Sequence, residues 1–239
     1  MNSIKRDMKR KKIAVLSGAG ISAESGIKTF RDAGGLWEGH DVMEVASPRG
    51  WMKNTNLVLD FYNQRRRQLK DVKPNLAHHE IQKLEQSYDV VVITQNVDDL
   101  HERAGSSNVI HLHGELRKVR SVNNESLITY TEEDVILGDL ASDGHQLRPH
   151  IVWFGEMVPM LDKAADEVSD SDIVIIVGTS MQVYPAAGLV SYASQNSELF
   201  YVDPKPHISY ELKLRSNLRI LERTATQGIP DIVKSLLSR

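Results

Sequence analysis

The chain of 239 residues contains no cysteine. This absence excludes a thiol nucleophile, a disulfide framework, and any zinc or iron–sulfur site that uses cysteine ligands. It says little about the compartment, because a chain without thiols suits oxidising and reducing surroundings alike. Any chemistry must therefore come from other side chains.

An excess of positive charge and a long apolar segment are also missing. Lysine and arginine number 29 against 32 aspartates and glutamates, so the composition gives no electrostatic reason to expect a nucleic-acid partner. No apolar run approaches the roughly 20 residues that span a bilayer. The basic start, MNSIKRDMKRKK, precedes only IAVLS before a glycine turn, which is too short for a signal-peptide core. We therefore expect a cytoplasmic protein without a membrane or nucleic-acid partner.

The composition that remains is ordinary for a globular protein, with 41% hydrophobic and 26% charged residues. Short β-branched runs at 13–17, 89–94 and 172–180, with weaker ones at 199–203 and 218–222, alternate with helical patterns. The first three runs are continuously apolar, as expected of strands buried on both faces. The alternation predicts an α/β fold with a Rossmann-like, doubly wound parallel sheet.

Residues 36–72 and 117–148 interrupt this alternation. The first stretch contains no convincing strand and predicts a helix over 51–70, with an apolar side formed by Leu57, Val58, Phe61 and Leu69. The second stretch is polar and rich in turn residues. We predict that the two insertions form a small helical and irregular lobe on a large lobe made of residues 1–35, 73–116 and 149–239.

A glycine-rich segment, GAGISA, follows the first expected strand and opens a helix. This is the context of a dinucleotide fingerprint, in which Gly18 permits the tight turn and Gly20 lets the backbone approach a pyrophosphate; Ala23 takes the third small position. The alternative is a glycine-rich turn with no ligand.

Glu38 lies at the usual distance for a ribose-binding acid but in a loop, whereas Asp203 ends an expected strand and is the better candidate.

Polar residues follow the second strong strand in TQNVDDLHERAG. Gln95, Asn96 and Asp98 lie where a parallel strand ends, which is the edge at which doubly wound sheets bind ligands. Their amides and carboxylate could orient sugar hydroxyls and a carboxamide. Capping of the next helix by Asn96 or Asp98 is the alternative, and the two roles are compatible.

Two histidines alternate in VIHLHGEL. On a strand, His111 and His113 would point to one face, where either could act as a general base near neutral pH. A metal site that also uses Glu115 is the alternative, although Gly114 is expected to end the strand. Because the pattern is so short, purely structural roles for the two histidines are as open as functional ones.

Five segments, in this order, resemble motifs of the sirtuin (Sir2) family: GAGISAESGIKTFRDAGGLWE (18–38), TQNVDDLHERAG (94–105), HLHGEL (111–116), PHIVWFGE (149–156) and GTSMQVYPAAG (178–188). The resemblance extends over nearly the whole chain and is closest to bacterial class III sirtuins. It implies an NAD-dependent protein-lysine deacylase with a Rossmann-type large lobe and a small lobe that usually holds zinc.

The resemblance also implies roles for individual residues. His113, which directly precedes Gly114, matches the catalytic histidine, and Asn96 and Asp98 match residues that take part in catalysis. The NAD site is implied at Gly18, Ala19, Gly20, Ile21, Ser22, Phe30, Arg31, Trp37, Gln95, Asn96, Asp98, Gly178, Thr179, Ser180, Tyr201, Asp203 and Ala225.

The acyl-lysine substrate is implied to bind at a second group of residues. Tyr62 and Arg65 form the Tyr-x-x-Arg pattern that is similar to the class III signature for acidic acyl groups, and Arg65 could grip a carboxylate with two hydrogen bonds. The alternative is that Arg65 belongs to a solvated run of arginines. Ala33 matches a small residue that widens the acyl pocket, and the substrate backbone is expected to pair with Val152, Phe154, Gly155 and Glu156.

Three positions depart from the family pattern. Lys28 replaces a common proline in the loop after the fingerprint, and Tyr201 stands where asparagine is common. Ser121 occupies the position of the first zinc-ligand cysteine. Because the family's zinc cysteines are absent, we expect NAD as a cofactor but no zinc or other metal.

The function that the resemblance implies is removal of acyl groups from the lysine side chains of acylated proteins. Acetyl, succinyl and malonyl groups would be transferred to ADP-ribose, with release of nicotinamide, 2′-O-acyl-ADP-ribose and free lysine. The alternatives are an NAD(P)-dependent oxidoreductase on the same fold, or a non-catalytic NAD-binding scaffold. The sequence predicts no oligomeric state.

Overall fold

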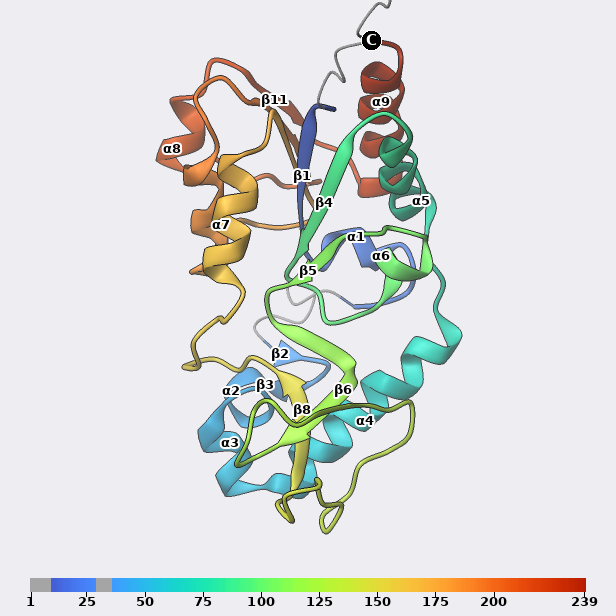
Figure 1. Cartoon of the computed structure of the whole chain (residues 1–239), viewed down its shortest axis with the longest axis vertical. Helices are drawn as coiled ribbons and strands as arrows, with labels where there is room; N and C mark the ends of the chain where they lie inside the picture. Colours follow the sequence, from blue (N-terminus) through green and yellow to red (C-terminus); the bar gives the residue numbers. More distant parts are fainter. Residues whose placement is uncertain (1–9, 29–35) are drawn as a thin grey trace, which may run out of the picture.

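Six parallel strands form the sheet of the large lobe, in the order β11-β10-β9-β1-β4-β5 (Figure 1). The computed structural model describes residues 10–28 and 36–239. The chain adds β4 and β5 on one side of β1 and then returns to the other side, so the sheet has its switch point between β1 and β9. The strands are β1 (Lys12–Ser17), β4 (Asp89–Thr94), β5 (Val109–His111), β9 (Ile173–Val177), β10 (Glu198–Val202) and β11 (Leu218–Leu221).

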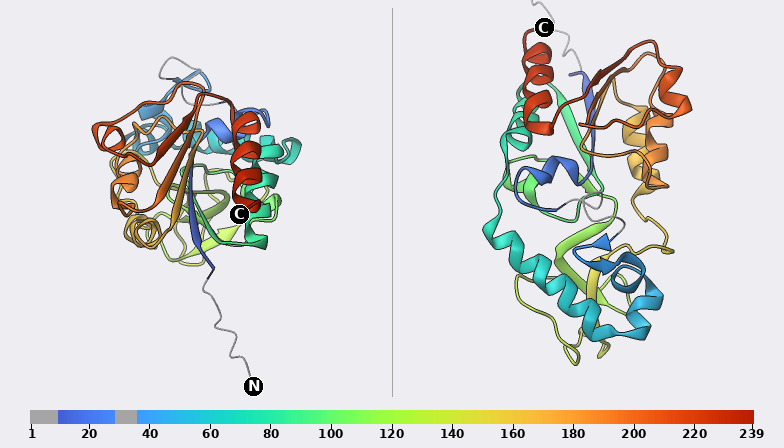
Figure 2. Two further views of the ribbon diagram at one scale, coloured as in Figure 1. Left: turned by 90° about the horizontal axis from the view of Figure 1, so that it is seen from above. Right: turned by 180° about the vertical axis from the view of Figure 1, so that it is seen from behind.

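Helices cover both faces of this sheet (Figure 2). Side chains alternate along each strand, so Ala14 and Leu16 of β1 face one helical layer, and Ile13 and Val15 face the other. One layer contains α7 (Leu161–Ser169), α8 (Tyr210–Lys213) and a 3-10 helix (Ala186–Tyr192). The other contains α1 (Gly20–Ala23), α5 (Leu76–Lys83), a 3-10 turn (Leu84–Gln86) and α9 (Ala225–Leu237).

The small lobe combines the two insertions. Its first part contains β2 (Leu36–Trp37), β3 (His40–Asp41), α2 (Val42–Val45), α3 (Pro48–Lys53) and α4 (Thr55–Asp71). Its second part is an antiparallel sheet in the order β7-β6-β8, made of β6 (Gly114–Ser121), β7 (Ile128–Tyr130) and β8 (Leu147–Ile151). α4 packs on this sheet, with Phe61, Tyr62, Leu116, Ile151 and Trp153 in one buried cluster.

The predicted fold class is confirmed, with two local differences. The helix expected over 51–70 is two helices, because the Asn54 side chain accepts the Leu57 N–H at 3.0 Å and starts α4 anew. The small lobe also has more strand than expected, since 36–72 includes the β2–β3 hairpin and 117–148 includes β7 and parts of β6 and β8. The exact lobe boundaries proposed from the sequence stay a prediction.

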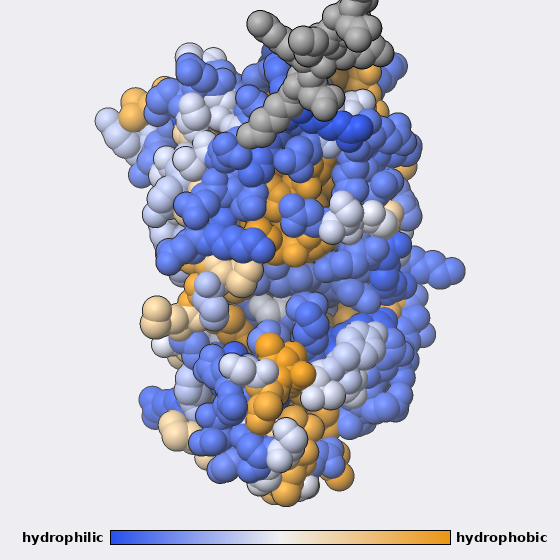
Figure 3. Space-filling view, in the orientation of Figure 1, coloured by the Kyte–Doolittle hydropathy of each residue, from blue (hydrophilic) through white to orange (hydrophobic). Residues whose placement is uncertain are grey.

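The surface of the described chain carries scattered apolar side chains. Within the second insertion, Ile136, Leu137 and Leu140 are more than half exposed, and Figure 3 shows hydrophobic surface over the small lobe. None of the helices in the described part of the chain is long and apolar enough to span a membrane.

Candidate active site

The glycine loop after β1 packs directly on the loop after β9. The Gly20 N–H donates to the Gly178 carbonyl at 2.7 Å. A Cβ on Gly20 would lie 2.7 Å from the Gly178 Cα, and a Cβ on Gly178, whose φ is +61°, would lie 2.2 Å from the Ile21 nitrogen. The contact between the two loops therefore itself requires glycine. The helix that the loop opens, α1, has only four residues.

Ser22 connects this glycine loop to the segment after β4. Its hydroxyl donates to Asp98 Oδ2 at 3.0 Å and accepts from Asn96 Nδ2 at 3.2 Å, while Asn96 also donates to the Gly18 carbonyl at 3.2 Å. Asp98 Oδ1 accepts the Leu100 N–H at the start of α6 (Leu100–Arg103), so Asp98 also stabilises that helix end. Burial raises the pKa of Asp98 to about 6.

His113 lies beside the same segment, where β5 ends. Its Nδ1 is 3.0 Å from the Gln95 carbonyl, which can only accept, so Nδ1 carries a proton and Nε2 of the neutral ring is the acceptor. Burial lowers the pKa of His113. Gln95 Nε2 also donates to Thr179 Oγ1 at 3.0 Å, which connects this segment to the loop after β9. A neutral histidine with a free lone pair suits a general base.

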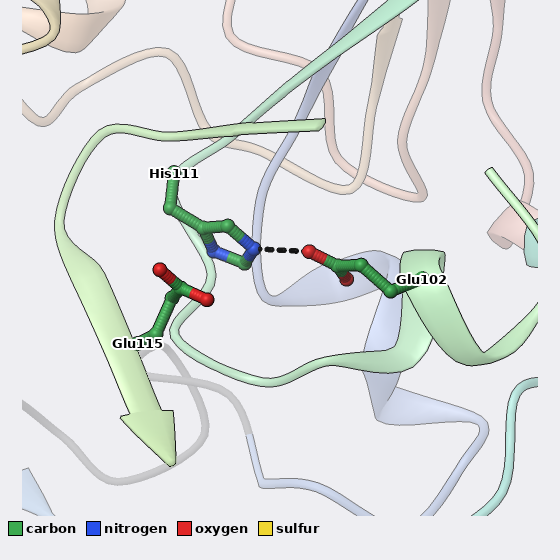
Figure 4. Close-up of side chains that lie close together, drawn as sticks. All are labelled: Glu102, His111 and Glu115. Atoms are coloured by element: carbon green, nitrogen blue, oxygen red, sulfur yellow. Dashed lines mark hydrogen bonds and ion pairs between the residues drawn. The ribbon is translucent and has the colours of Figure 1, made fainter. Parts of the chain in front are cut away.

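His111, two residues earlier, binds a different set of groups (Figure 4). Its Nδ1 is 3.0 Å from the Asn96 carbonyl and its Nε2 is 2.6 Å from Glu102 Oε1. Burial disfavours the charged ring, but the Glu102 carboxylate outweighs this effect and raises the pKa of His111. Glu115 lies near both side chains and forms an ion pair with Lys118 at 2.6 Å. Among the described residues, the group that could hold a metal ion consists of Glu102, His111 and Glu115 and does not include His113.

The residues expected around adenosine lie at the carboxyl ends of β9 and β10. Thr179 and Ser180 follow β9, Asp203 follows β10 and is buried, and Ala225 begins α9. Tyr201 is fully buried, and its hydroxyl donates to the Thr179 carbonyl at 2.9 Å. Tyr201 thus supports the loop after β9, and its direct contact with the cofactor stays a prediction.

Arg65 of α4 lines a cleft that also contains residues of the segment after β4. The cleft is lined by Ile27, Lys28, Trp37, Glu38, Arg65, Gln68, Leu69, Val97, Asp98 and Leu116. The Arg65 guanidinium stacks 3.9 Å from the Phe61 ring centre, and burial lowers its pKa. Tyr62 is fully buried behind this wall, where its hydroxyl accepts from Trp153 Nε1 at 3.0 Å. Arg65, but not Tyr62, is therefore placed on the cleft wall.

The three successive arginines do not form one solvated surface. Arg66 is 2% exposed and donates to the Leu116 carbonyl at 2.9 Å and to Asn63 Oδ1 at 2.8 Å, which ties α4 to β6. Arg67 alone fits the solvated alternative, with an ion pair to Asp134 at 2.6 Å.

The expected substrate-binding segment follows β8. The Val152 N–H donates to the His113 carbonyl at 3.0 Å, so this segment lies directly beside the histidine loop. The Phe154 and Glu156 N–H groups already donate within the protein, to the Ala46 and Trp153 carbonyls. An added substrate strand would therefore rely on carbonyl groups and on the Gly155 N–H. The Glu156 carboxylate is itself bound to Arg148, at 2.7 and 3.1 Å.

Some expected site residues are not placed, and some contacts were not foreseen. Phe30, Arg31 and Ala33 lie outside the described residues. No sequence pattern predicts Glu102 as the partner of His111 or Glu38 as a neighbour of Arg65. These pairs lie 9 and 27 residues apart, so the tertiary fold and not a local pattern brings them together.

The region that would hold zinc contains a hydrogen-bonded serine. Ser121 Oγ donates to Asp143 Oδ2 at 2.7 Å and accepts the N–H groups of Asn123 and Asn124 at 3.0 and 3.2 Å. Four thiolates are the usual ligands of a structural zinc ion in such a module, and the chain has none. The residues present therefore do not fit a zinc site of that kind.

Comparisons with known proteins agree on one family. A model of the Sir2 family matches residues 18–185. An NAD-dependent protein deacylase of Helicobacter pylori strain J99 is 56% identical over 227 residues, which cover 95% of this chain and 96% of that protein. A protein of the same name from Bacteroides thetaiotaomicron is 48% identical and covers 95% and 98% of the two chains.

Solved structures give the same result. A Sir2 homologue in complex with NAD matches with a TM-score of 0.83 at 37% identity, over 96% of this chain and 90% of the other. A Sir2 protein bound to an acetylated peptide matches with a TM-score of 0.78 at 28% identity, over 96% and 95%.

Proposed function

The chain belongs to the Sir2 family and is an NAD-dependent protein deacylase, and we propose that it removes succinyl and malonyl groups, as well as acetyl groups, from lysine side chains. The observation that carries the acidic part of this proposal is the position of Arg65. Its guanidinium lines the same cleft as Asp98, next to the segment where nicotinamide is expected. A guanidinium in a partly buried cleft favours a carboxylate ligand.

The side chains at the sheet edge suit NAD. Hydroxyl, amide and carboxylate groups converge there from Ser22, Gln95, Asn96, Asp98 and Thr179, and such groups match ribose hydroxyls and a carboxamide. When bound, NAD supplies a ribose carbon that gives up nicotinamide and receives the acyl oxygen.

The protein's own groups then have distinct tasks. Asn96 and Asp98, held by Ser22, would orient the nicotinamide end of the cofactor. His113 Nε2 would accept a proton from a ribose hydroxyl, while Gln95 keeps its Nδ1 protonated. The segment after β8, bonded to the His113 carbonyl, would present the acylated lysine beside this base.

Mass spectrometry of one peptide with acetyl-, succinyl- or malonyl-lysine, incubated with and without NAD, tests the proposal. We expect NAD-dependent loss of each acyl group, with one nicotinamide released per lysine freed. Loss of acetyl alone would refute the proposed removal of succinyl and malonyl groups while leaving the deacylase assignment intact.

The two alternative functions, an oxidoreductase and a non-catalytic scaffold, would give different results in the same assay. A hydride-transferring enzyme would accumulate reduced cofactor, and a scaffold would release no nicotinamide. The cytoplasmic location and the lack of a nucleic-acid partner stay predictions.

A further inference from the structure

Glu38 occupies an unusual backbone position at the edge of the Arg65 cleft. It lies in the tight turn between β2 and β3, where Trp37 pairs with His40, and its φ is +50°. A non-glycine residue rarely adopts this left-handed conformation, but a two-residue hairpin turn requires it at both central positions, and Gly39 beside it has a φ of +84°. The turn places Glu38 in the lining of the cleft that contains Arg65.

The Glu38 carboxylate lies between two cations. Its Oε2 is 3.8 Å from Arg65 Nη2 and 3.2 Å from Lys28 Nζ. The side chains of Glu38 and Arg65 are 17% and 12% exposed, whereas that of Lys28 is 73% exposed. All three residues line the same cleft.

The Arg65 guanidinium keeps hydrogen-bonding capacity even with Glu38 beside it. Its Nη1 donates to the Phe61 carbonyl at 3.0 Å, but its buried Nε has no hydrogen-bond partner among the described residues. Within that part of the chain, Glu38 is also the one carboxylate within 4.0 Å of the guanidinium. At 3.8 Å the contact is too long for a good hydrogen bond, so Glu38 neutralises Arg65 only in part.

We propose that Glu38 competes with the acyl carboxylate of the substrate for Arg65, and that Lys28 limits this competition by holding Glu38. The proposal rests on the acidic-acyl function proposed above and names the residues that tune it. Glu38 is then a specificity-determining residue and Lys28 its counter-charge.

The charges of the group formed by Lys28, Arg65 and Glu38 explain why both residues matter. Asp98 also lines the cleft but is not among the described carboxylates within 4.0 Å of Arg65. Lys28, Arg65 and Glu38 together carry a net charge of +1, so one acyl carboxylate makes the cluster neutral. Without Lys28, the incoming carboxylate would meet a pair that is already neutral. Without Glu38, it would meet two cations and no competitor.

Two opposite substitutions test this balance. Glu38→Gln should lower the KM for a succinyl-lysine peptide about two- to fivefold, and Lys28→Met should raise it by a similar factor, the range for partly exposed ion pairs. Each variant is assayed in parallel on a butyryl-lysine peptide, which has the same number of acyl carbons but no carboxylate. We expect the succinyl-to-butyryl ratio of kcat/KM to rise in the first variant and fall in the second.

Glu133→Gln is the matched control, because Glu133 is a small-lobe acid with an 84% exposed side chain that does not line the cleft. The succinyl-to-butyryl ratio of kcat/KM for this variant should equal that of the wild type. A Glu38→Gln variant whose ratio stays constant or falls would overturn the proposal, since Glu38 would then be neutral or would help to position Arg65.

The outcome also separates this inference from the proposed function. If the wild type removes butyryl but not succinyl groups, and Glu38→Gln gains succinyl activity, the proposed removal of acidic acyl groups is wrong and the competition is supported. If the wild type is an efficient desuccinylase and neither variant changes the ratio, the proposed function stands and the competition is refuted.

Discussion

At the residue scale, the contacts of His113 determine what it can do chemically. The Gln95 carbonyl holds its Nδ1 proton, so the ring can accept a proton only at Nε2. We expect His113→Ala to lower deacylation about 10²–10⁴-fold, the usual contribution of a general base. Nicotinamide release measures the rate, and isothermal titration measures NAD binding, which should largely survive. Turnover above a tenth of the wild-type value would contradict the assignment.

The pH dependence that we expect for catalysis follows from two buried groups, His113 and Asp98. Burial lowers the pKa of His113, and a base must be unprotonated, so the active form persists below the ordinary histidine value of about 6.5. Asp98, whose pKa is raised to about 6, accepts hydrogen bonds on both oxygens, and in the role proposed for it the side chain acts as a carboxylate.

We therefore expect kcat/KM to be level near neutral pH and to fall as the pH drops through about 6. A pH profile of nicotinamide release between acid and neutral pH provides the measurement. An acid limb centred well above 6.5 would show that neither group controls the rate in the way proposed here.

Arg65 offers a test of acyl choice. Loss of a charge-assisted hydrogen bond costs about 1.5–3 kcal/mol, or roughly 10–150-fold in kcat/KM. Arg65→Met should depress desuccinylation by that factor, while deacetylation falls far less or improves in the now apolar cleft. Tyr62→Phe should act in the same direction but more weakly, because Tyr62 is neutral and lies behind the cleft wall. An equal fall of both activities in Arg65→Met would make the arginine structural.

At the element scale, the turn after β6 shows how the small lobe is held without thiolates. Ser121 is fully buried and joins β6 to Asp143 while it satisfies the Asn123 and Asn124 N–H groups. Ser121→Ala would leave these groups unpaired, at a cost of about 1–3 kcal/mol. All three tryptophans pack in the small-lobe core, so thermal unfolding followed by tryptophan fluorescence reports on this lobe.

We expect Ser121→Ala to lower the melting temperature by about 2–4 °C for each kcal/mol lost. Ser126→Ala, an exposed serine of the same turn, is the control and should melt like the wild type. Equal melting temperatures for the two variants would mean that the Ser121 contacts do not stabilise the lobe.

The elements also show which features the sequence could predict. Continuous apolar runs such as 89–94 and 172–180 predicted buried parallel strands, because both faces of each strand are covered and no polar alternation is possible. The break at Asn54 was missed, since the apolar spacing of 51–70 continues across it while a single side-chain cap separates α3 from α4. β7 was missed because all three of its side chains are exposed.

The positions of several candidate site residues could be predicted from the sequence, but some of their contacts could not. Gly18, Asn96 and His113 each lie at the end of a strand, so local sequence and sheet topology together placed them at one edge. The contacts of Glu38 with Arg65 and of Glu102 with His111 depend on how the small lobe and α6 pack, which no local spacing encodes.

At the scale of the whole molecule, polar contacts connect the two lobes near the cleft. The Arg103 guanidinium of α6 donates to the Leu69 and Val72 carbonyls at the end of α4, at 3.0 and 2.6 Å. The Leu116 N–H of β6 donates to the Val97 carbonyl at 2.8 Å. The position of the small lobe thus depends on hydrogen bonds and packing next to Asp98 and His113.

Because this arrangement involves no thiolate ligand, we expect the whole protein to fold without stoichiometric zinc. A structural four-cysteine site contributes on the order of 10 kcal/mol to the folding of a small module, so its removal by a chelator would be obvious in a thermal melt. Here a chelator should leave the melting temperature unchanged, and elemental analysis of the purified protein should find far less than one zinc per chain. A zinc-containing sirtuin with intact cysteines, treated in parallel, is the positive control. One bound zinc per chain, together with a chelator-induced fall in melting temperature, would show that histidines and carboxylates have replaced the thiolates.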